Sequence, residues 1–180
     1  VSNAIDIMDG QRYDAPTKPW GGTEQINWSP DSKSLTYTCK HSVGKEYSLS
    51  TNSDIFVYSL ESEETYNISE GMMGYDIGAI YSPDGKYLAW ESMERDGYEA
   101  DKNRLMIYNF ETGKIIDYST GFDRNVHGIS WSADSKKIWF TCDDKARFQI
   151  YNFDIATVSF NAITKGDHNY RSVAEAGDIL

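Results

Sequence analysis

Carboxylate and guanidinium side chains gather in one short stretch of this sequence, between positions 91 and 104. Paired carboxylates can hold an ammonium group through charge-assisted hydrogen bonds, and a neighbouring tyrosine can add a further polar contact. The stretch therefore predicts a binding site for a cationic group of a substrate. The candidate binding residues are Glu91, Glu94, Arg95, Asp96, Tyr98, Glu99 and Asp101.

A second interpretation of the same stretch stays open. Arg95 or Arg104 would pair with the carboxylates, and the resulting ion pairs would fix the shape of a loop without contacting any ligand. Calcium is a weaker alternative, because the carboxylates lack the spacing of a calcium-binding loop. We predict no metal site.

Catalytic motifs are absent from the sequence. A serine nucleophile on a sharp strand-to-helix turn needs Gly-x-Ser-x-Gly, and the nearest match, Gly128 to Ser132, lacks the second glycine and falls on a predicted strand. The histidines His41, His127 and His168 belong to no nucleophile or metal motif, and no phosphate-binding glycine loop is present. We predict no catalytic residue and no cofactor in this chain.

Composition excludes several classes of protein. The net charge of −11 over 180 residues disfavours nucleic acid and anionic membrane surfaces as partners. With 39% hydrophobic and 14% aromatic residues the chain can form a core, yet no run approaches the ~18 apolar residues of a membrane span. Cys39 and Cys142 occupy the same position of a repeat in separate units, so we expect no disulfide between them.

The sequence contains an internal repeat of about 50 residues, which predicts the scaffold that carries the stretch 91–104. The segment Trp28 to Lys33 returns as Tyr81 to Lys86 and as Trp131 to Lys136, each followed by a β-rich run. A second strand-like element returns in the same phase at 57–60, 107–110 and 150–153. Four short strands per period with turns between them are typical of a β-propeller blade. The fold class is therefore all-β, a propeller portion with three full four-stranded blades.

The phase of the repeat gives the expected organisation. Residues 4–11 align with 107–114, so the chain is expected to begin in the last two strands of a preceding blade, and a new first strand is expected near Ser172 to Glu175. The predicted units are 1–20 for the end of one blade, 21–70, 71–121 and 122–166 for the full blades, and 167–180 for the start of the next. Open blade edges further predict self-association.

Turns and loops differ between the two ends of the blades. Asp31, Asp84 and Asp134 lie in the short turn between the first and second strands, where an aspartate accepts hydrogen bonds from amides two residues on. The connections between second and third strands are long at 40–53 and 92–103 and short at 143–147. Because function concentrates in loops held by a rigid scaffold, we expect the face with the long loops to meet the substrate.

Several segments together resemble a known family: 50–55, 71–76, 82–86, 91–101 and 166–170. They are similar to the propeller of bacterial dipeptidyl and acylaminoacyl peptidases of the prolyl oligopeptidase family. The resemblance implies that a separate α/β-hydrolase domain, absent from this chain, carries the catalytic Ser, Asp and His. Tyr98-Glu99 resembles a Tyr-Glu-Glu element that holds a substrate ammonium in this family, although Ala100 replaces the second Glu.

The resemblance favours a substrate-gating and docking propeller that is catalytically inactive by itself. Its expected partners are a peptide substrate and the hydrolase domain, with no nucleic acid and no membrane. The alternative is a non-enzymatic propeller of the TolB-like or WD type that binds protein partners. A periplasmic or extracytoplasmic location is implied only because relatives of this type are often exported.

Overall fold

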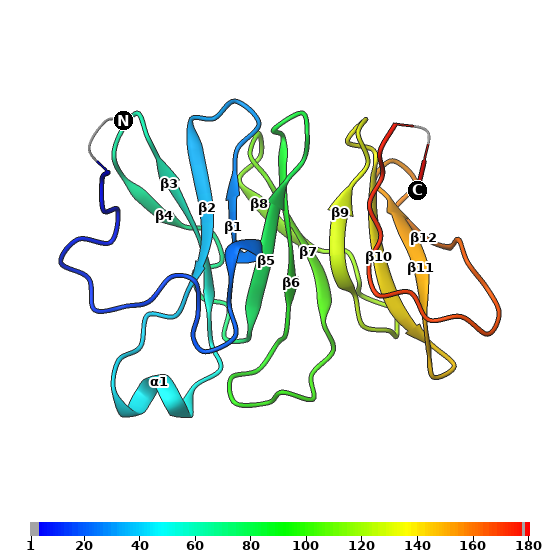
Figure 1. Cartoon of the computed structure of the whole chain (residues 1–180), viewed down its shortest axis with the longest axis horizontal. Helices are drawn as coiled ribbons and strands as arrows, with labels where there is room; N and C mark the ends of the chain where they lie inside the picture. The colour runs from blue at the N-terminus through cyan, green and yellow to red at the C-terminus, as the bar shows by residue number, and fades with distance from the viewer. Residues whose placement is uncertain (1–3, 178) are drawn as a thin grey trace.

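Twelve strands form three separate four-stranded antiparallel sheets in the computed structural model, which describes residues 4–177 and 179–180 (Figure 1). In the first sheet the order is β1-β2-β3-β4, with bounds Ile26–Trp28, Ser34–Cys39, Asp54–Ser59 and Thr65–Asn67. In the second it is β5-β6-β7-β8, with bounds Asp76–Tyr81, Tyr87–Ser92, Arg104–Asn109 and Lys114–Asp117. In the third it is β9-β10-β11-β12, with bounds His127–Trp131, Lys137–Asp144, Arg147–Asp154 and Ser159–Ala162.

Sequential strands pair with their neighbours throughout, as expected for propeller blades, and the all-β propeller prediction is confirmed. The three sheets lie side by side, and the strands of all three are aligned with roughly the same axis (Figure 1). Each sheet falls within one of the ranges 21–70, 71–121 and 122–166, which we therefore propose as the blade boundaries.

The core lies between neighbouring sheets. Trp90 and Leu88 of β6 pack with Ile55 of β3 to fill the first interface. Phe140 and Phe153 of the third sheet fill the second interface together with Leu105 of β7. The middle strands of a blade are covered on both faces, so successive residues in them are buried. Cys39 and Cys142 are free thiols buried in these strands.

The predicted aspartate turns are present in all three blades. Asp31, Asp84 and Asp134 each accept a hydrogen bond from the amide two residues on, at 3.1 Å in every case. Each also accepts a hydrogen bond from the serine hydroxyl two residues before it. The residue after each aspartate has a positive φ, which glycine adopts without strain and serine does not.

The two ends of the described chain differ from the expected strands. Within residues 4–11 only 7–10 form turns, and Ile7 and Met8 pack on the apolar face of β2 and β3. Near the other end, the Val173 carbonyl accepts a hydrogen bond from Ser130, and the only pairing is a bridge between Ala176 and Ile179. The predicted strands do not form because an isolated two-stranded ribbon is marginal without further strands beside it. Self-association stays a prediction.

The long loops emerge on one face, as the sequence predicted. The 40–53 connection carries the short helix α1 (Lys45–Leu49), and it lies beside the loop between β6 and β7 at the bottom of Figure 1. A 3₁₀ turn, η1 (Thr23–Gln25), leads into β1. In the third blade the same connection is a two-residue turn at Lys145 and Ala146, both with positive φ, which is typical of a tight hairpin.

Candidate functional site

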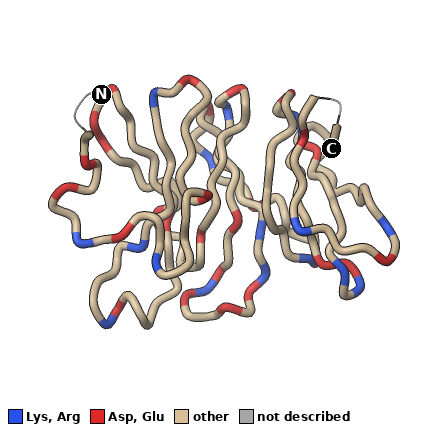
Figure 2. The backbone as a smooth tube through the Cα atoms, in the orientation of Figure 1, with Lys and Arg blue, Asp and Glu red and all other residues tan. Residues whose placement is uncertain are grey.

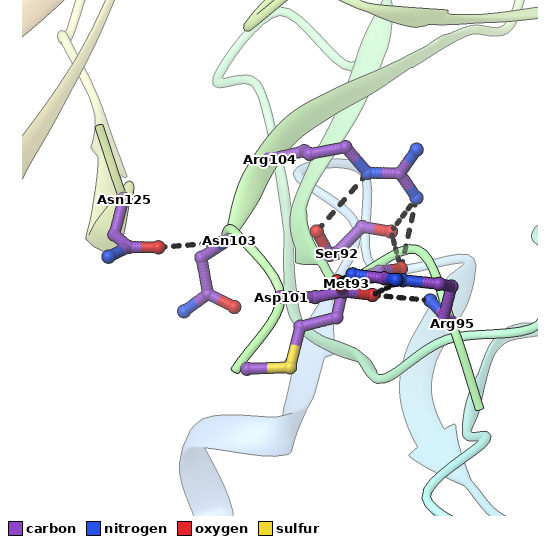
Figure 3. A network of polar contacts seen from close by, with 7 residues as sticks. All are labelled: Ser92, Met93, Arg95, Asp101, Asn103, Arg104 and Asn125. Carbon is purple, nitrogen blue, oxygen red and sulfur yellow. Dashed lines mark hydrogen bonds and ion pairs between the residues drawn. The ribbon is translucent and has the colours of Figure 1, made fainter. Parts of the chain in front are cut away.

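The loop between β6 and β7 is held in shape by its own polar contacts (Figure 3). Arg95 pairs with Asp101, since its Nε donates to Asp101 Oδ1 at 2.9 Å and its amide donates to Oδ2 at 2.8 Å. The Arg95 guanidinium also lies 3.9 Å from the centre of the Tyr98 ring. Arg95, Tyr98 and Asp101 thus form one internal cluster, of the kind that the loop-shaping interpretation predicts.

Arg104 does not form the ion pair with the loop carboxylates that the loop-shaping interpretation offered for it. Its Nη2 donates to Ser92 Oγ at 3.0 Å and to the Met93 carbonyl at 2.9 Å, and it forms no ion pair with the acidic residues of the loop (Figure 3). The guanidinium therefore caps the end of β6 instead of pairing a carboxylate.

Asp96 reaches across to the neighbouring blade. Its Oδ1 accepts hydrogen bonds from the Thr51 amide at 2.6 Å, the Asn52 amide at 3.1 Å and the Ser50 hydroxyl at 2.8 Å. Desolvation opposes ionisation, but these hydrogen bonds prevail and lower the pKa of Asp96. Its carboxylate is therefore occupied by loop 40–53.

Glu91 lies away from the loop surface, inside the second interface. It is buried in β6, where its Oε1 accepts a 2.7 Å hydrogen bond from the Gly128 amide and its Oε2 lies 3.4 Å from Asn103 Nδ2. Desolvation outweighs these contacts and raises the pKa of Glu91 to about 7. The Glu91 Oε2 to His127 Nδ1 distance is 3.9 Å. The structure therefore places Glu91 between blades rather than beside the other candidates.

Glu99 lines a cavity of about 380 Å³ on the face with the long loops. Three segments form the walls around it: the stretch 17–21, the 40–53 loop and the residue before β5. The lining residues that sequence reasoning missed are Thr17, Lys18, Trp20, Gly21, Lys40, Tyr47, Thr51 and Tyr75, together with Met93 of the predicted loop. Glu94 is exposed on the same loop and does not line this cavity.

Aromatic side chains make much of the cavity wall. The Tyr47 hydroxyl accepts a 2.9 Å hydrogen bond from the Lys18 amide and donates to the Lys18 carbonyl at the same distance. Trp20 is 90% exposed, so its indole is available to a ligand. No periodicity marks these residues, because they come from an irregular segment and a short helix that only the tertiary structure brings together.

The charged side chains of the cavity wall differ in whether they have polar partners. Lys40 Nζ donates to the Tyr47 carbonyl at 2.6 Å and also to the Ser50 carbonyl, while burial lowers the pKa of Lys40. Lys18 pairs with Asp14 at 3.0 Å. Within the described part of the chain, the Glu99 carboxylate has no hydrogen bond and no ion pair. Both acidic and basic positions occur along the loop that carries it (Figure 2).

Three loops meet tightly beside this cavity. The Met93 amide donates to the Tyr75 carbonyl at 3.1 Å, and the Ser53 amide donates to the Gly74 carbonyl at 3.2 Å. A side chain at Gly74 would collide with the Met93 carbonyl, so glycine is required for this approach. The connection before β5 is thereby fixed between the two long loops.

Neither a metal centre nor a membrane-spanning helix is found in residues 4–177 and 179–180. No group of three or more His, Cys, Asp or Glu side chains in these residues is arranged to hold a metal ion. No helix there has the length and apolar character needed to cross a bilayer.

Comparison with known proteins identifies the relatives of this chain. The sequence is 45% identical over 180 residues to dipeptidyl-peptidase 5 of Porphyromonas gingivalis, which covers all of this chain and 26% of that protein. It is 40% identical over 170 residues to dipeptidyl-peptidase 5 of Porphyromonas endodontalis, which covers 94% of this chain and 25% of that protein. Over essentially its whole length, the chain is therefore similar to one portion of proteins named dipeptidyl-peptidase 5.

Solved structures agree with the propeller fold of this chain. An acylaminoacyl peptidase in complex with Z-Gly-Gly-Phe-chloromethyl ketone matches with a TM-score of 0.62 at 19% identity, over 83% of this chain and 22% of that one. TolB from Acinetobacter baumannii matches with a TM-score of 0.59 at 23% identity, over 81% and 33%. No family model matches the sequence. The chain spans about a quarter of the length of the curated relatives it matches.

Proposed function

We propose that this chain is the substrate-gating and docking propeller portion of a serine exopeptidase of the dipeptidyl or acylaminoacyl type. The observation that carries the proposal is the 45% identity to a dipeptidyl-peptidase 5, which extends over the whole chain. Bond cleavage would take place on a separate hydrolase domain, because the sequence has no nucleophile motif. By itself the chain would be inactive.

Glu99 is the side chain that we propose for contact with substrate. Its carboxylate is free of intramolecular partners among the described residues, and it opens onto a cavity whose 380 Å³ falls within the range of small-ligand sites. A carboxylate beside Trp20, Tyr47 and Tyr75 suits a positively charged amine attached to an apolar side chain. The N-terminal end of a peptide has this chemistry.

The other candidates contribute through the shape of the face. Arg95, Tyr98 and Asp101 are engaged with one another, and Asp96 with the first blade. Under this proposal they hold the gating loops, whereas Glu91 supports the interface between blades and Glu94 contributes charge at the rim.

A cleavage assay on the longer gene product tests the proposal. We expect that product to hydrolyse a dipeptidyl or acyl-amino-acid chromogenic substrate, and this chain to hydrolyse neither. Cleavage by this chain alone would contradict a purely docking role, and a longer reading frame without a Gly-x-Ser-x-Gly motif would contradict the peptidase assignment.

The variant Glu99→Gln tests the ammonium contact. It keeps the shape of the side chain and removes the charge, so KM for a substrate with a free N-terminus should rise by roughly tenfold, as for loss of a charged hydrogen bond. Glu111→Gln is the matched control, because Glu111 is exposed on the turn between β7 and β8, on the opposite face. Equal KM values for the two variants would remove Glu99 from the proposed site.

A further inference from the structure

Asp96 stands out among the polar groups of the loop face because all its contacts cross from one blade to the next. A single carboxylate oxygen accepts the Thr51 and Asn52 amides and the Ser50 hydroxyl, at 2.6, 3.1 and 2.8 Å. The contact is reciprocal, since the Gly97 amide donates to Thr51 Oγ1 at 2.8 Å. The loop of the second blade thus holds residues 50–52 of the first blade in place.

The segment that Asp96 caps has little stability of its own. It directly follows α1, a helix of five residues with no buried side chain, and helices this short do not persist without tertiary contacts. The helix supplies Tyr47 to the cavity wall, and the segment after it supplies Thr51. The position of that wall therefore depends on what anchors residues 50–52.

We propose that Asp96 is a positioning residue that locks the two long loops together and sets the shape of the cavity beside Glu99. The lock itself follows from the hydrogen bonds, while its effect on substrate rests on the function proposed above. Asp96 would not contact the substrate, because it does not line the cavity and its Oδ1 already accepts hydrogen bonds from the first blade.

Amide hydrogen exchange on this chain tests the lock without any activity assay. In Asp96→Ala the Thr51 amide should exchange faster by about tenfold or more, because it loses its only described acceptor. The Asn52 amide should speed up less, because it also donates to Ser50 Oγ at 3.1 Å. In Asp96→Asn the amide oxygen still accepts hydrogen bonds, so exchange should be intermediate. Amides of β7, such as Ile107, should be unchanged and report that the fold is intact.

A matched control and a reciprocal variant complete the exchange experiment. Asp123→Asn removes a carboxylate from an exposed loop on the same face, with no described hydrogen bond or ion pair, and should leave Thr51 and Asn52 unchanged. If Asp96→Ala does not fold, Thr51→Val takes its place and should speed exchange at Gly97. Unchanged exchange at Thr51 and Asn52 in a folded Asp96→Ala variant would refute the lock.

Kinetics on the longer gene product test the link to the cavity. Asp96→Ala should raise KM and leave kcat unchanged, with Asp96→Asn between it and the parent, since a misplaced wall weakens binding without altering the reacting groups. Faster exchange with an unchanged KM would refute the link to the cavity. Absence of peptidase activity in the parent would instead count against the proposed function, while hydrogen exchange would still decide whether the lock exists.

Discussion

Replacement of Glu91 by glutamine should change how the stability of this chain depends on pH. Glu91 is 9% exposed at the interface between the second and third blades, and its pKa is raised from 4.5 to about 7 by burial. One pKa unit corresponds to about 1.4 kcal/mol. Ionisation of Glu91 therefore costs the folded state about 3 kcal/mol.

The sign of the effect follows from the raised pKa. Below pH 4.5 the carboxyl is protonated in both the folded and the unfolded state, so its contribution to stability is fully present. As the pH rises from 4.5 through about 7, the unfolded chain ionises first and the free energy of unfolding decreases. Above about pH 7 the folded chain no longer has the stabilising contribution of the protonated Glu91 carboxyl.

Glu91→Gln should remove this dependence. The glutamine carbonyl can still accept the hydrogen bond from the Gly128 amide. Its NH₂ group would face Asn103 Nδ2, so the Asn103 amide has to rotate to present its Oδ1, which has no partner among the described residues. We expect the variant to match the parent near pH 4.5 and to exceed it by up to about 3 kcal/mol at pH 8.

Urea denaturation of both proteins at a series of pH values measures the difference. The comparison is made between parent and variant, so the contribution of the other buried carboxyl, Asp76, whose pKa is also raised to about 7, cancels. Glu111→Gln serves as the exposed control and should show no trend with pH. A parent-to-variant difference that stays constant from pH 4.5 to 8 would refute the reasoning.

Three further substitutions test the packing and the turns. Phe140→Ala should lower the free energy of unfolding by about 3–5 kcal/mol in urea denaturation, because the ring is fully buried in the second interface; a loss below about 1 kcal/mol would mean that this interface is not packed as described. Ser32→Gly should leave the free energy of unfolding unchanged or raise it by up to about 1 kcal/mol in the same urea denaturation. The reason is that Ser32 has a φ of 59°, and the matching turn of the second blade has Gly85 at this position. Ser135→Gly should gain less in the same assay, because Ser135 Oγ accepts a hydrogen bond from the Asp84 amide, and equal gains would argue against that contact.

The repeat in the sequence was sufficient to predict the blades. Each return of the Ser-x-Asp turn marks the change from first to second strand, and the aspartate contacts that define it are local, spanning two residues. Local hydrogen bonds and a strict strand period depend little on the rest of the molecule. For the same reason the short turn at Lys145 and Ala146 and the two long loops could be located in advance.

The end segments show where a repeat alone is insufficient. Residues 4–11 match the repeat, yet within them 7–10 form turns that cover the face of β2 and β3. A strand needs a neighbouring strand for its backbone hydrogen bonds. The sequence of one segment does not show whether such a neighbour lies beside it.

The cavity was decided by tertiary structure. Sequence proximity grouped seven candidate residues, but folding sends Glu91 into an interface, pairs Arg95 with Asp101 and turns Asp96 toward the first blade. Only Glu99 of that group reaches the cavity, where it meets Trp20 and Tyr47 from segments more than 50 residues away. The sequence thus determined the blades and the face on which the loops emerge, because turn and strand preferences are local. Which side chains share a site depended on how three irregular loops pack against one another, and such packing leaves no period in the sequence.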